Sequence, residues 1–476
     1  MASRTLSSRT SPLATPPLAA SLVAGTVMFT LLLAVPAILA DPDTLWQVWT
    51  GEWMLAHRAI PLTDPFSYTA FGKRWYAHQW LSEALMGLAH HVGDLRGVMV
   101  LTGLAVGLTA GMLLFHLRRF MALIPAVLVL SQALANTAGS LLARPHVLAW
   151  PCLELWCAGL VLARAEGRAP RWWLLPVMTL WVNLHGSFMM GLLLPFAFAA
   201  EAAIEAGTAW RESLTRWLAF ILAAWGCAAL NPDGIEGLLF PFQLLGMSNL
   251  NWIGEWSPAD FSAFHPLELL LLLLLGAGLS GKLTLPPFRL LMLLGLIHMA
   301  LQHWRHDPLL GLIGALLLAE AIGRLAPPEP RRPASPLFRI ALPLGLGVLA
   351  AGALVARFAL PLDTPPGTAV FSVLDRLPPT LRARPVLNDY GFGAYLIAHG
   401  ERPFIDSRAD LYGDAFLGRF RAISNLDESV LAATLREYDI AWTIFPPAAP
   451  VLVLLDRQPG WHRLPGQDGA VVHVRD

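Results

Sequence analysis

Two aspartates, Asp41 and Asp43, stand immediately after the first long apolar run of the chain, residues 18–40. Carboxylates two residues apart beside a membrane segment repel each other and are costly to desolvate, so they need a cation or a proton-transfer role to stabilise them. A carboxylate can accept the proton of an attacking hydroxyl group, and a carboxylate pair can hold a hard divalent cation against a phosphate. The pair therefore favours the chemistry of group transfer.

Further polar residues gather in loops that we expect on the same side of the membrane as this acidic pair. Ionisable groups near membrane depth are costly, and they usually line a cavity or serve a function. We therefore expect one polar site at that membrane surface, where cations can neutralise a phosphate through charge-assisted hydrogen bonds. The substrate- or phosphate-binding candidates are Asp64, Lys73, Arg74, His78, Arg144, His185, Glu255, Arg305 and His306.

These residues must be positioned by the membrane segments and by the long loop 41–96. In that loop Trp46, Trp49 and Trp53 recur at spacings of three and four, which predicts one face of a helix lying in the membrane interface. A second amphipathic piece, 80–91, leads into the next apolar segment. Simpler explanations stay open, because the tryptophans can form an ordinary interfacial belt, Asp64 before a proline can be a turn residue and His306 can be a loop residue.

The composition indicates a membrane protein, since 55% of the residues are hydrophobic and only 14% are charged. Soluble domains average about 25% charged residues. The formal net charge of zero argues against nucleic acid as a partner. We expect about eleven transmembrane helices, each satisfying its own backbone hydrogen bonds. The apolar segments cover residues 18–40, 97–116, 120–138, 146–163, 172–187, 188–206, 216–230, 265–280, 286–302, 308–323 and 338–359.

Basic residues are distributed unevenly between the two sets of loops. The positive-inside rule places the richer set in the cytoplasm, together with the N-terminus, and an odd number of spans then places the C-terminal tail outside. We therefore expect a multi-pass protein of the cytoplasmic membrane. The basic residues of the richer set are Arg4, Arg9, Arg118, Arg119, Arg164, Arg168, Arg171, Arg211, Arg216, Lys282, Arg289, Arg324, Arg331, Arg332 and Arg339.

The fold class that we predict is an all-α polytopic membrane bundle over residues 1–359, followed by a small soluble α/β domain over residues 360–476. In this tail the apolar runs shorten and the charge rises. Short β-like runs at 384–387, 403–405, 441–445 and 470–474 alternate with helical stretches at 392–399, 415–424 and 431–438. Such alternation is typical of an α/β domain.

Several sequence motifs accompany the acidic pair. The first external loop begins with DPDTLWQVWTGEWMLAHRAIPLTDPFSYTAFGKRWYAHQWLSE, and the later motifs are NLHGSF at 183–188, NPDG at 231–234, EW at 255–256, RHDPLLGL at 305–312, LNDYGFGAYLI at 387–397 and PFIDSRADLYGD at 403–414. Together they resemble a group of bacterial polytopic membrane proteins of the GT-C glycosyltransferase class. The class is distantly similar to protein mannosyltransferases and oligosaccharyltransferases. The GT-C architecture has a first span ending in an acidic pair, a large first external loop and an extracytoplasmic C-terminal domain.

The resemblance implies inverting transfer of a sugar from a polyprenyl-phosphate donor to an acceptor on the periplasmic face of the membrane. It implies that Asp43 or Asp41 is the catalytic base or the ligand of a divalent cation, Mg²⁺ or Mn²⁺, and that Arg305 or His306 stabilises the phosphate. The acceptor stays open among glycan, lipid and protein, because the sequon-binding motif of oligosaccharyltransferases and the Lys-Pro-Pro signature of mannosyltransferases have no counterpart in the sequence. Tail residues could touch the sugar or simply cap helices, namely Asp389, Asp406, Asp410, Asp414 and Arg408.

Two other functions stay open. A transporter or flippase of lipid-linked or hydrophobic cargo would place charges at mid-membrane in broken helices and would show internal repeats. Here the charges are expected at helix ends on one side, and no repeat is visible in the sequence. The third function is that of a membrane assembly protein without enzymatic activity, whose tail binds periplasmic partners.

Overall fold

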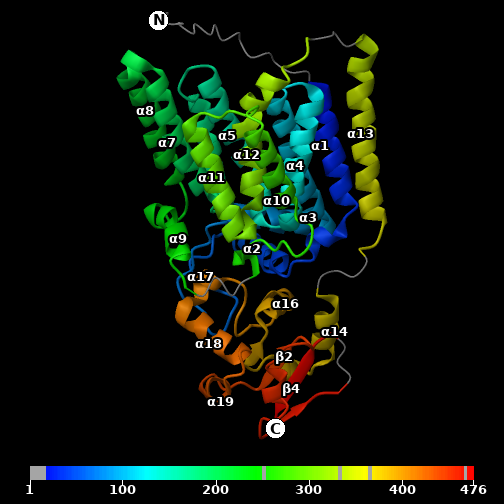
Figure 1. Cartoon of the computed structure of the whole chain (residues 1–476). Helices are drawn as coiled ribbons and strands as arrows, with labels where there is room; N and C mark the ends of the chain where they lie inside the picture. The colour runs from blue at the N-terminus through cyan, green and yellow to red at the C-terminus, as the bar shows by residue number, and fades with distance from the viewer. Residues whose placement is uncertain (1–17, 249–253, 331–334, 363–366, 466–468) are drawn as a thin grey trace, which may run out of the picture.

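The computed structural model describes residues 18–248, 254–330, 335–362, 367–465 and 469–476. A bundle of apolar helices forms one end of the molecule and the C-terminal tail forms the other, with helix α2 (Asp43–His57) between them (Figure 1). Of the basic residues used to predict the orientation, Arg4, Arg9, Arg331 and Arg332 lie outside the described residues. The orientation in the membrane stays a prediction.

Each predicted apolar segment corresponds to a helix of the bundle. Six helices are long and apolar enough, by length and composition, to cross a membrane, and shorter apolar helices accompany them. These features identify a membrane protein, while the predicted number of spans stays a prediction. The helices are α1 (Leu18–Leu33), α3 (Trp80–Leu117), α4 (Leu123–Thr137), α5 (Pro145–Ala165), α6 (Leu175–Leu184), α7 (Phe188–Glu205), α8 (Trp210–Ala228), α10 (Pro266–Leu279), α11 (Pro287–Gln302), α12 (Asp307–Leu325) and α13 (Pro336–Ala359), with α9 (Ile235–Leu245) beside them.

Helices α1 and α3 pack closely because glycines face each other at their crossing. A Cβ atom on Gly25 would lie 2.8 Å from the carbonyl oxygen of Gly107, and one on Gly107 would lie 2.7 Å from that of Gly25. Small residues of this kind allow helix backbones to approach in membranes. Helix α1 is thereby held against α3, and the acidic pair leaves the bundle at a fixed place.

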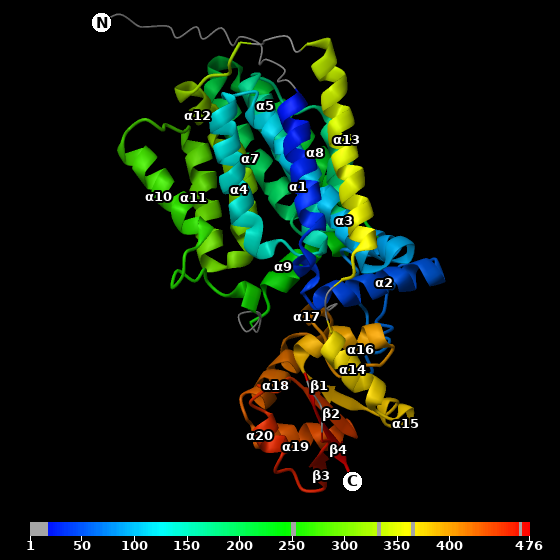
Figure 2. The ribbon, with the colours of Figure 1, turned by 90° about the vertical axis from the view of Figure 1, so that its right-hand side faces the viewer.

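The first external loop contains the two predicted amphipathic pieces. Helix α2 lies across the end of the bundle (Figure 2). The second piece is the first part of α3, which is separated from the apolar part by non-helical backbone at Gly93 and Asp94. Between the two helices, residues 58–79 form turns and a single antiparallel bridge between Thr63 and Arg74. The loop is therefore an ordered platform between the bundle and the tail.

The tail contains a four-stranded sheet with the order β1-β2-β4-β3. Strand β1 (Val386–Asn388) pairs in parallel with β2 (Trp442–Phe445), whereas β4 (Val471–Arg475) is antiparallel to β2 and to β3 (Trp461–Arg463). This sheet and its helices confirm a small α/β fold for the tail. The helices are α14 (Thr368–Arg376), α15 (Pro379–Arg382), α16 (Gly393–His399), α17 (Ala409–Tyr412), α18 (Asp414–Ser424), α19 (Glu428–Glu437) and α20 (Leu452–Leu455).

The predicted strand at 403–405 differs from the structure, where this segment joins no sheet. Side chains bind its backbone instead. The amide of Asn388 accepts from the N–H of Phe404 at 2.7 Å and donates to the carbonyl of Ile405 at 2.7 Å. The hydroxyl of Thr69 in the first external loop donates to the carbonyl of Phe404 at 2.5 Å. Phe404 and Ile405 are both buried, but these side-chain bonds replace a β-ladder.

The core of the tail continues into the first external loop. Leu45, Trp46, Ala70 and Trp75 of that loop are buried in the same apolar cluster as the tail residues Phe404 and Trp442. Burial of apolar surface is the main favourable term in association between such surfaces. The tail is therefore packed directly on the loop that carries the acidic pair.

Candidate active site

The acidic pair lies where the chain leaves the bundle and enters α2. Asp41 follows the short helical turn η1 (Pro36–Leu39), and its Oδ1 accepts a hydrogen bond of 2.9 Å from the N–H of Asp43, the first residue of α2. A carboxylate is stabilised at a helix N-terminus because the free N–H groups there carry partial positive charge. The first turn of α2 thereby fixes the positions of both aspartates.

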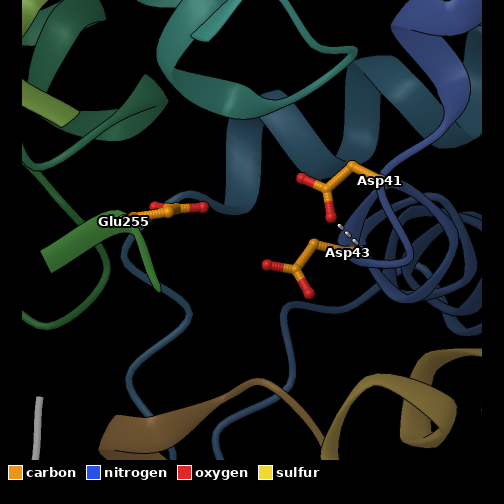
Figure 3. A group of neighbouring side chains, drawn as sticks. All are labelled: Asp41, Asp43 and Glu255. Carbon is orange, nitrogen blue, oxygen red and sulfur yellow. Dashed lines mark hydrogen bonds between the residues drawn. The ribbon is translucent and has the colours of Figure 1, made fainter. Parts of the chain in front are cut away.

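Arg144 binds both of these carboxylates. It precedes Pro145 at the start of α5, so its backbone is extended. Its Nη2 donates to Oδ2 of Asp43 at 2.5 Å, and its Nε lies 3.2 Å from Oδ2 of Asp41. Its Nη1 donates to a third carboxylate, that of Glu255. The three carboxylates face a common space from two sides (Figure 3).

Glu255 comes from a distant part of the chain and is held by the segment that precedes α12. It lies in the turn η6 (Gly254–Trp256), and the indole of Trp304 donates to the carbonyl of Gly254 at 2.9 Å. The ring nitrogen Nδ1 of His303 lies 2.6 Å from the carbonyl oxygen of Trp256. The predicted residues Asp41, Asp43, Arg144 and Glu255 are therefore brought together.

Arg305 provides a second cation beside this cluster. Its guanidinium lies 4.3 Å from the centre of the Trp256 ring, and its Nη1 lies 3.9 Å from Oε2 of Glu255. The side chain is 28% exposed. The ring of His306 also lies near Trp256, with ring centres 6.4 Å apart. A guanidinium that is oriented by stacking and still open to solvent suits the binding of a phosphate.

The charges of the cluster separate the acidities of its carboxyl groups. Burial, counteracted by Arg144 and reinforced by Asp41, raises the pKa of Asp43 from 3.8 to about 6. Burial also raises the pKa of Glu255, but the charges of Arg144 and Arg305 outweigh it and lower that pKa to about 2. Of Asp43 and Glu255, Asp43 therefore has the stronger affinity for a proton, as a general base near neutral pH requires.

The tail contributes residues to the site that the sequence did not single out. The hydroxyl of Ser407 is buried beside Asp43, and its interaction with the carboxylate lowers the pKa of that group. Burial raises the pKa of Tyr390, and the nearby charges of Asp43 and Glu255 raise it further. The hydroxyl of Tyr390 donates to the carbonyl of Ser407 at 3.1 Å. Both residues belong to motifs quoted for the tail, at 387–397 and 403–414, but only the folded chain brings them to Asp43.

Two of the predicted histidines lie next to the cluster as neutral imidazoles. Burial lowers the pKa of His185 well below 6.5, with further lowering by His146 and Arg305. Its Nδ1 accepts from the N–H of Ser187 at 3.1 Å. Burial also lowers the pKa of His78, which lines a small cavity together with residues such as Trp80 and Asn183. These rings can offer hydrogen bonds without adding charge.

Asp64, Lys73 and Arg74 are placed in contacts between parts of the fold. Asp64 is buried in an ion pair with Arg408 at 2.7 Å. The Nζ of Lys73 donates to the carbonyl of Leu411 at 2.5 Å, so it holds the tail as well. Arg74 is half-exposed and pairs with Asp233 and Glu236 at 3.0 and 3.3 Å. The structure does not bring these three residues into the cluster around Asp43.

The acidic cluster has the donor chemistry of a divalent-cation site. One oxygen from each of Asp41, Asp43 and Glu255 lies within 4.8 Å of the others, and Mg²⁺ and Mn²⁺ prefer oxygen ligands of this kind. However, Arg144 already binds all three carboxylates. A divalent cation would therefore compete with a fixed guanidinium for the same groups, and the cluster as it stands does not fit such an ion.

Comparison with solved structures shows the fold of the chain. It is similar to the archaeal oligosaccharyltransferase AglB from Archaeoglobus fulgidus in complex with an inhibitory peptide and a dolichol-phosphate, with TM-score 0.52, 9% identity and coverage of 96% of this chain and 74% of that one. It is also similar to ArnT from Cupriavidus metallidurans bound to undecaprenyl phosphate, with TM-score 0.54, 12% identity and coverage of 96% and 97%.

At these identities the likeness shows the fold alone, and that fold is GT-C-like over nearly the whole chain. The apo form of the Archaeoglobus fulgidus oligosaccharyltransferase gives the same result, with TM-score 0.51, 10% identity and coverage of 96% of this chain and 74% of that one. The sequence matches no protein-family profile and no curated protein. The predicted GT-C-like class is therefore confirmed at the level of the fold.

Proposed function

We propose that this protein transfers a sugar from a polyprenyl-phosphate donor to an acceptor at the periplasmic face of the bacterial cytoplasmic membrane. The observation that carries the proposal is Asp43, a partly buried carboxylate of raised pKa that pairs with Arg144, while Arg305 lies beside Glu255 of the same cluster, on a GT-C-like fold. A displacement at the anomeric carbon needs a base for the acceptor and a cation for the departing phosphate. This site offers both within one cluster.

Asp43 is the proposed base. Its carboxylate takes the proton of the acceptor hydroxyl or amine while the acceptor forms a bond to the anomeric carbon. The bond from that carbon to the phosphate oxygen breaks with its electron pair, so the configuration at the sugar is inverted. Asp41 fixes the first turn of α2 through its bond to the N–H of Asp43 and thereby orients the base.

Arg305 is the proposed partner of the departing phosphate. It is partly exposed beside Glu255 and it is oriented by Trp256. His306 is a second candidate, because its ring also lies near that indole. A guanidinium can form two parallel hydrogen bonds to a phosphate, which stabilises the charge that develops on the leaving group.

The lipid part of the donor is proposed from the membrane setting and from the similar structures. The site lies at one end of an apolar helix bundle, where the headgroup of a membrane lipid would be found (Figure 1). Similar structures contain dolichol-phosphate and undecaprenyl phosphate, respectively. A lipid with a phosphate headgroup therefore suits both the surface and the charge of this site.

The test is a transfer assay with purified protein and labelled polyprenyl-phosphate sugars, comparing the wild type with Asp43→Asn. Loss of a general base lowers the rate by about 10²–10⁴-fold. The matched control is Asp375→Asn, because Asp375 is a 73% exposed aspartate of the tail that pairs with His399. We expect the control to keep wild-type activity and Asp43→Asn to lose it while remaining folded.

Two outcomes would count against the proposal. Equal activity of the wild type and Asp43→Asn would exclude Asp43 as the base. Absence of transfer and hydrolysis with every polyprenyl-phosphate sugar tested would remove the enzymatic function and favour transport of lipid-linked cargo. Binding of labelled lipid without transfer, measured in the same preparations, would support that alternative.

A further inference from the structure

Arg144 uses a different nitrogen for each carboxylate of the acidic cluster. Its Nε faces Asp41 at 3.2 Å, its Nη2 binds Asp43 at 2.5 Å and its Nη1 binds Glu255. The guanidinium therefore already binds the three carboxylates that could otherwise hold a divalent cation. Such a fork of donors is available to arginine and not to lysine, whose ammonium group is a single point charge.

The backbone holds Arg144 at this place. The N–H of Ala143 donates to the carbonyl of Ile38 at 2.7 Å, and the hydroxyl of Thr44 donates to the carbonyl of Ala143 at 3.1 Å. Residues on either side of the acidic pair thus bind the peptide that precedes Arg144. The side chain itself is only 16% exposed. Arg144 is therefore an ordered part of the site.

Glu255, the third carboxylate, is also held in place by its surroundings. The turn that carries Glu255 is held by Trp304 and His303, and Arg305 lies beside its free edge. Three carboxylates and two guanidinium groups leave a formal charge of one negative unit. A divalent ion placed among the carboxylates would meet Arg144 at short range in a partly desolvated site, where repulsion between cations is strong.

We propose that Arg144 takes the place of a divalent cation in this site, and that the protein works without a bound metal ion. The role of Arg144 in the reaction rests on the proposed function, whereas the test of metal binding does not depend on it. Arg144 is a positioning residue. It neutralises the acidic cluster, holds Asp43 and Glu255 at a fixed separation and leaves the phosphate to Arg305.

The test is a titration of metal-stripped protein with Mn²⁺, followed through the electron paramagnetic resonance signal of free Mn²⁺. We expect the wild type to show no Mn²⁺ site that depends on Glu255, and Arg144→Gln to gain one. Removal of a positive charge at this distance should strengthen Mn²⁺ binding by about tenfold or more. The double variant Arg144→Gln/Glu255→Gln should lose the gained site, because it lacks one of the three carboxylates.

Each outcome decides the inference. A Mn²⁺ site in the wild type that is lost in Glu255→Gln would overturn it, and so would a folded Arg144→Gln protein without Mn²⁺ binding. If Arg144→Gln does not fold, the wild-type titration decides alone. Sugar transfer that is abolished by EDTA and restored by Mg²⁺ would overturn the inference while supporting the proposed function. Absence of transfer would contradict the proposed function and leave the Mn²⁺ result valid.

Discussion

Arg408 of the tail and Asp64 of the first external loop form an ion pair with a separation of 2.7 Å between Nη1 and Oδ1, although 344 residues separate them in the chain. Both side chains are almost completely buried. Asp406 binds the same guanidinium through both of its oxygens, at 2.8 and 2.7 Å. The tail is thereby fixed to the loop, and Ser407 is carried to Asp43.

Removing Arg408 should destabilise the protein more than removing the charge of Asp64. Arg408→Met leaves Asp64 and Asp406 buried without their shared cation, so we expect a loss of about 3–5 kcal/mol in the free energy of unfolding. Asp64→Asn keeps the two-oxygen pair between Arg408 and Asp406 and should cost less. Thermal unfolding in detergent, together with limited proteolysis of the tail, measures the difference. Equal stabilities of the two variants would contradict this role of Arg408.

The sequence predicted the architecture better than it predicted the contacts between distant segments. Apolar runs and loop charge are local signals, so the helix bundle, a helix at Trp46 and the small sheet of the tail were predictable, but the burial of Trp46 against the tail was not. One polar site at the membrane surface was expected from the sequence, but the binding of Asp41, Asp43 and Glu255 by Arg144 was not. Asp64 was predicted as a functional polar residue, yet its partner Arg408 lies 344 residues further along the chain, and no local pattern identifies such a pair.

The transfer rate should depend on pH through the base. Burial raises the pKa of Asp43 to about 6, and the base is active when its carboxyl group is deprotonated. We therefore expect kcat/KM to rise about tenfold per pH unit below pH 6 and to level off above it. The measurement is the rate of sugar transfer between pH 5 and pH 8. A profile without an acidic limb would exclude Asp43 as the titrating base.

Ser407→Ala should displace that acidic limb. The hydroxyl of Ser407 stabilises the charged form of Asp43 and so lowers its pKa. Its removal should raise the pKa of Asp43 and move the limb to higher pH. A matched control is Ser372→Ala, since Ser372 is a helical serine of the tail whose hydroxyl donates to the carbonyl of Ala369 in the same helix. If both variants gave the wild-type profile, the tail would not influence the base.

Gly51 in α2 and Gly87 in α3 allow these two helices to pack closely, and this packing should position Asp43. A Cβ atom on Gly51 would lie 1.9 Å from the carbonyl oxygen of Glu83, and one on Gly87 would lie 2.4 Å from the carbonyl carbon of Gly51. These contacts are with backbone, so Gly51→Ala must push α2 away from α3. We expect a loss of about 1–3 kcal/mol in the free energy of unfolding.

Because Asp43 is the first residue of α2, this displacement should also move the base. A shift of about 1 Å can cost about 10²-fold in rate. Gly226→Ala in α8 is the matched control, since among the described residues nothing beyond the adjoining helix backbone lies within 4 Å of the added Cβ. Transfer rate and thermal unfolding are measured on both variants at one pH above the acidic limb. Gly51→Ala with wild-type activity would show that α2 does not need its close contact with α3 to position Asp43.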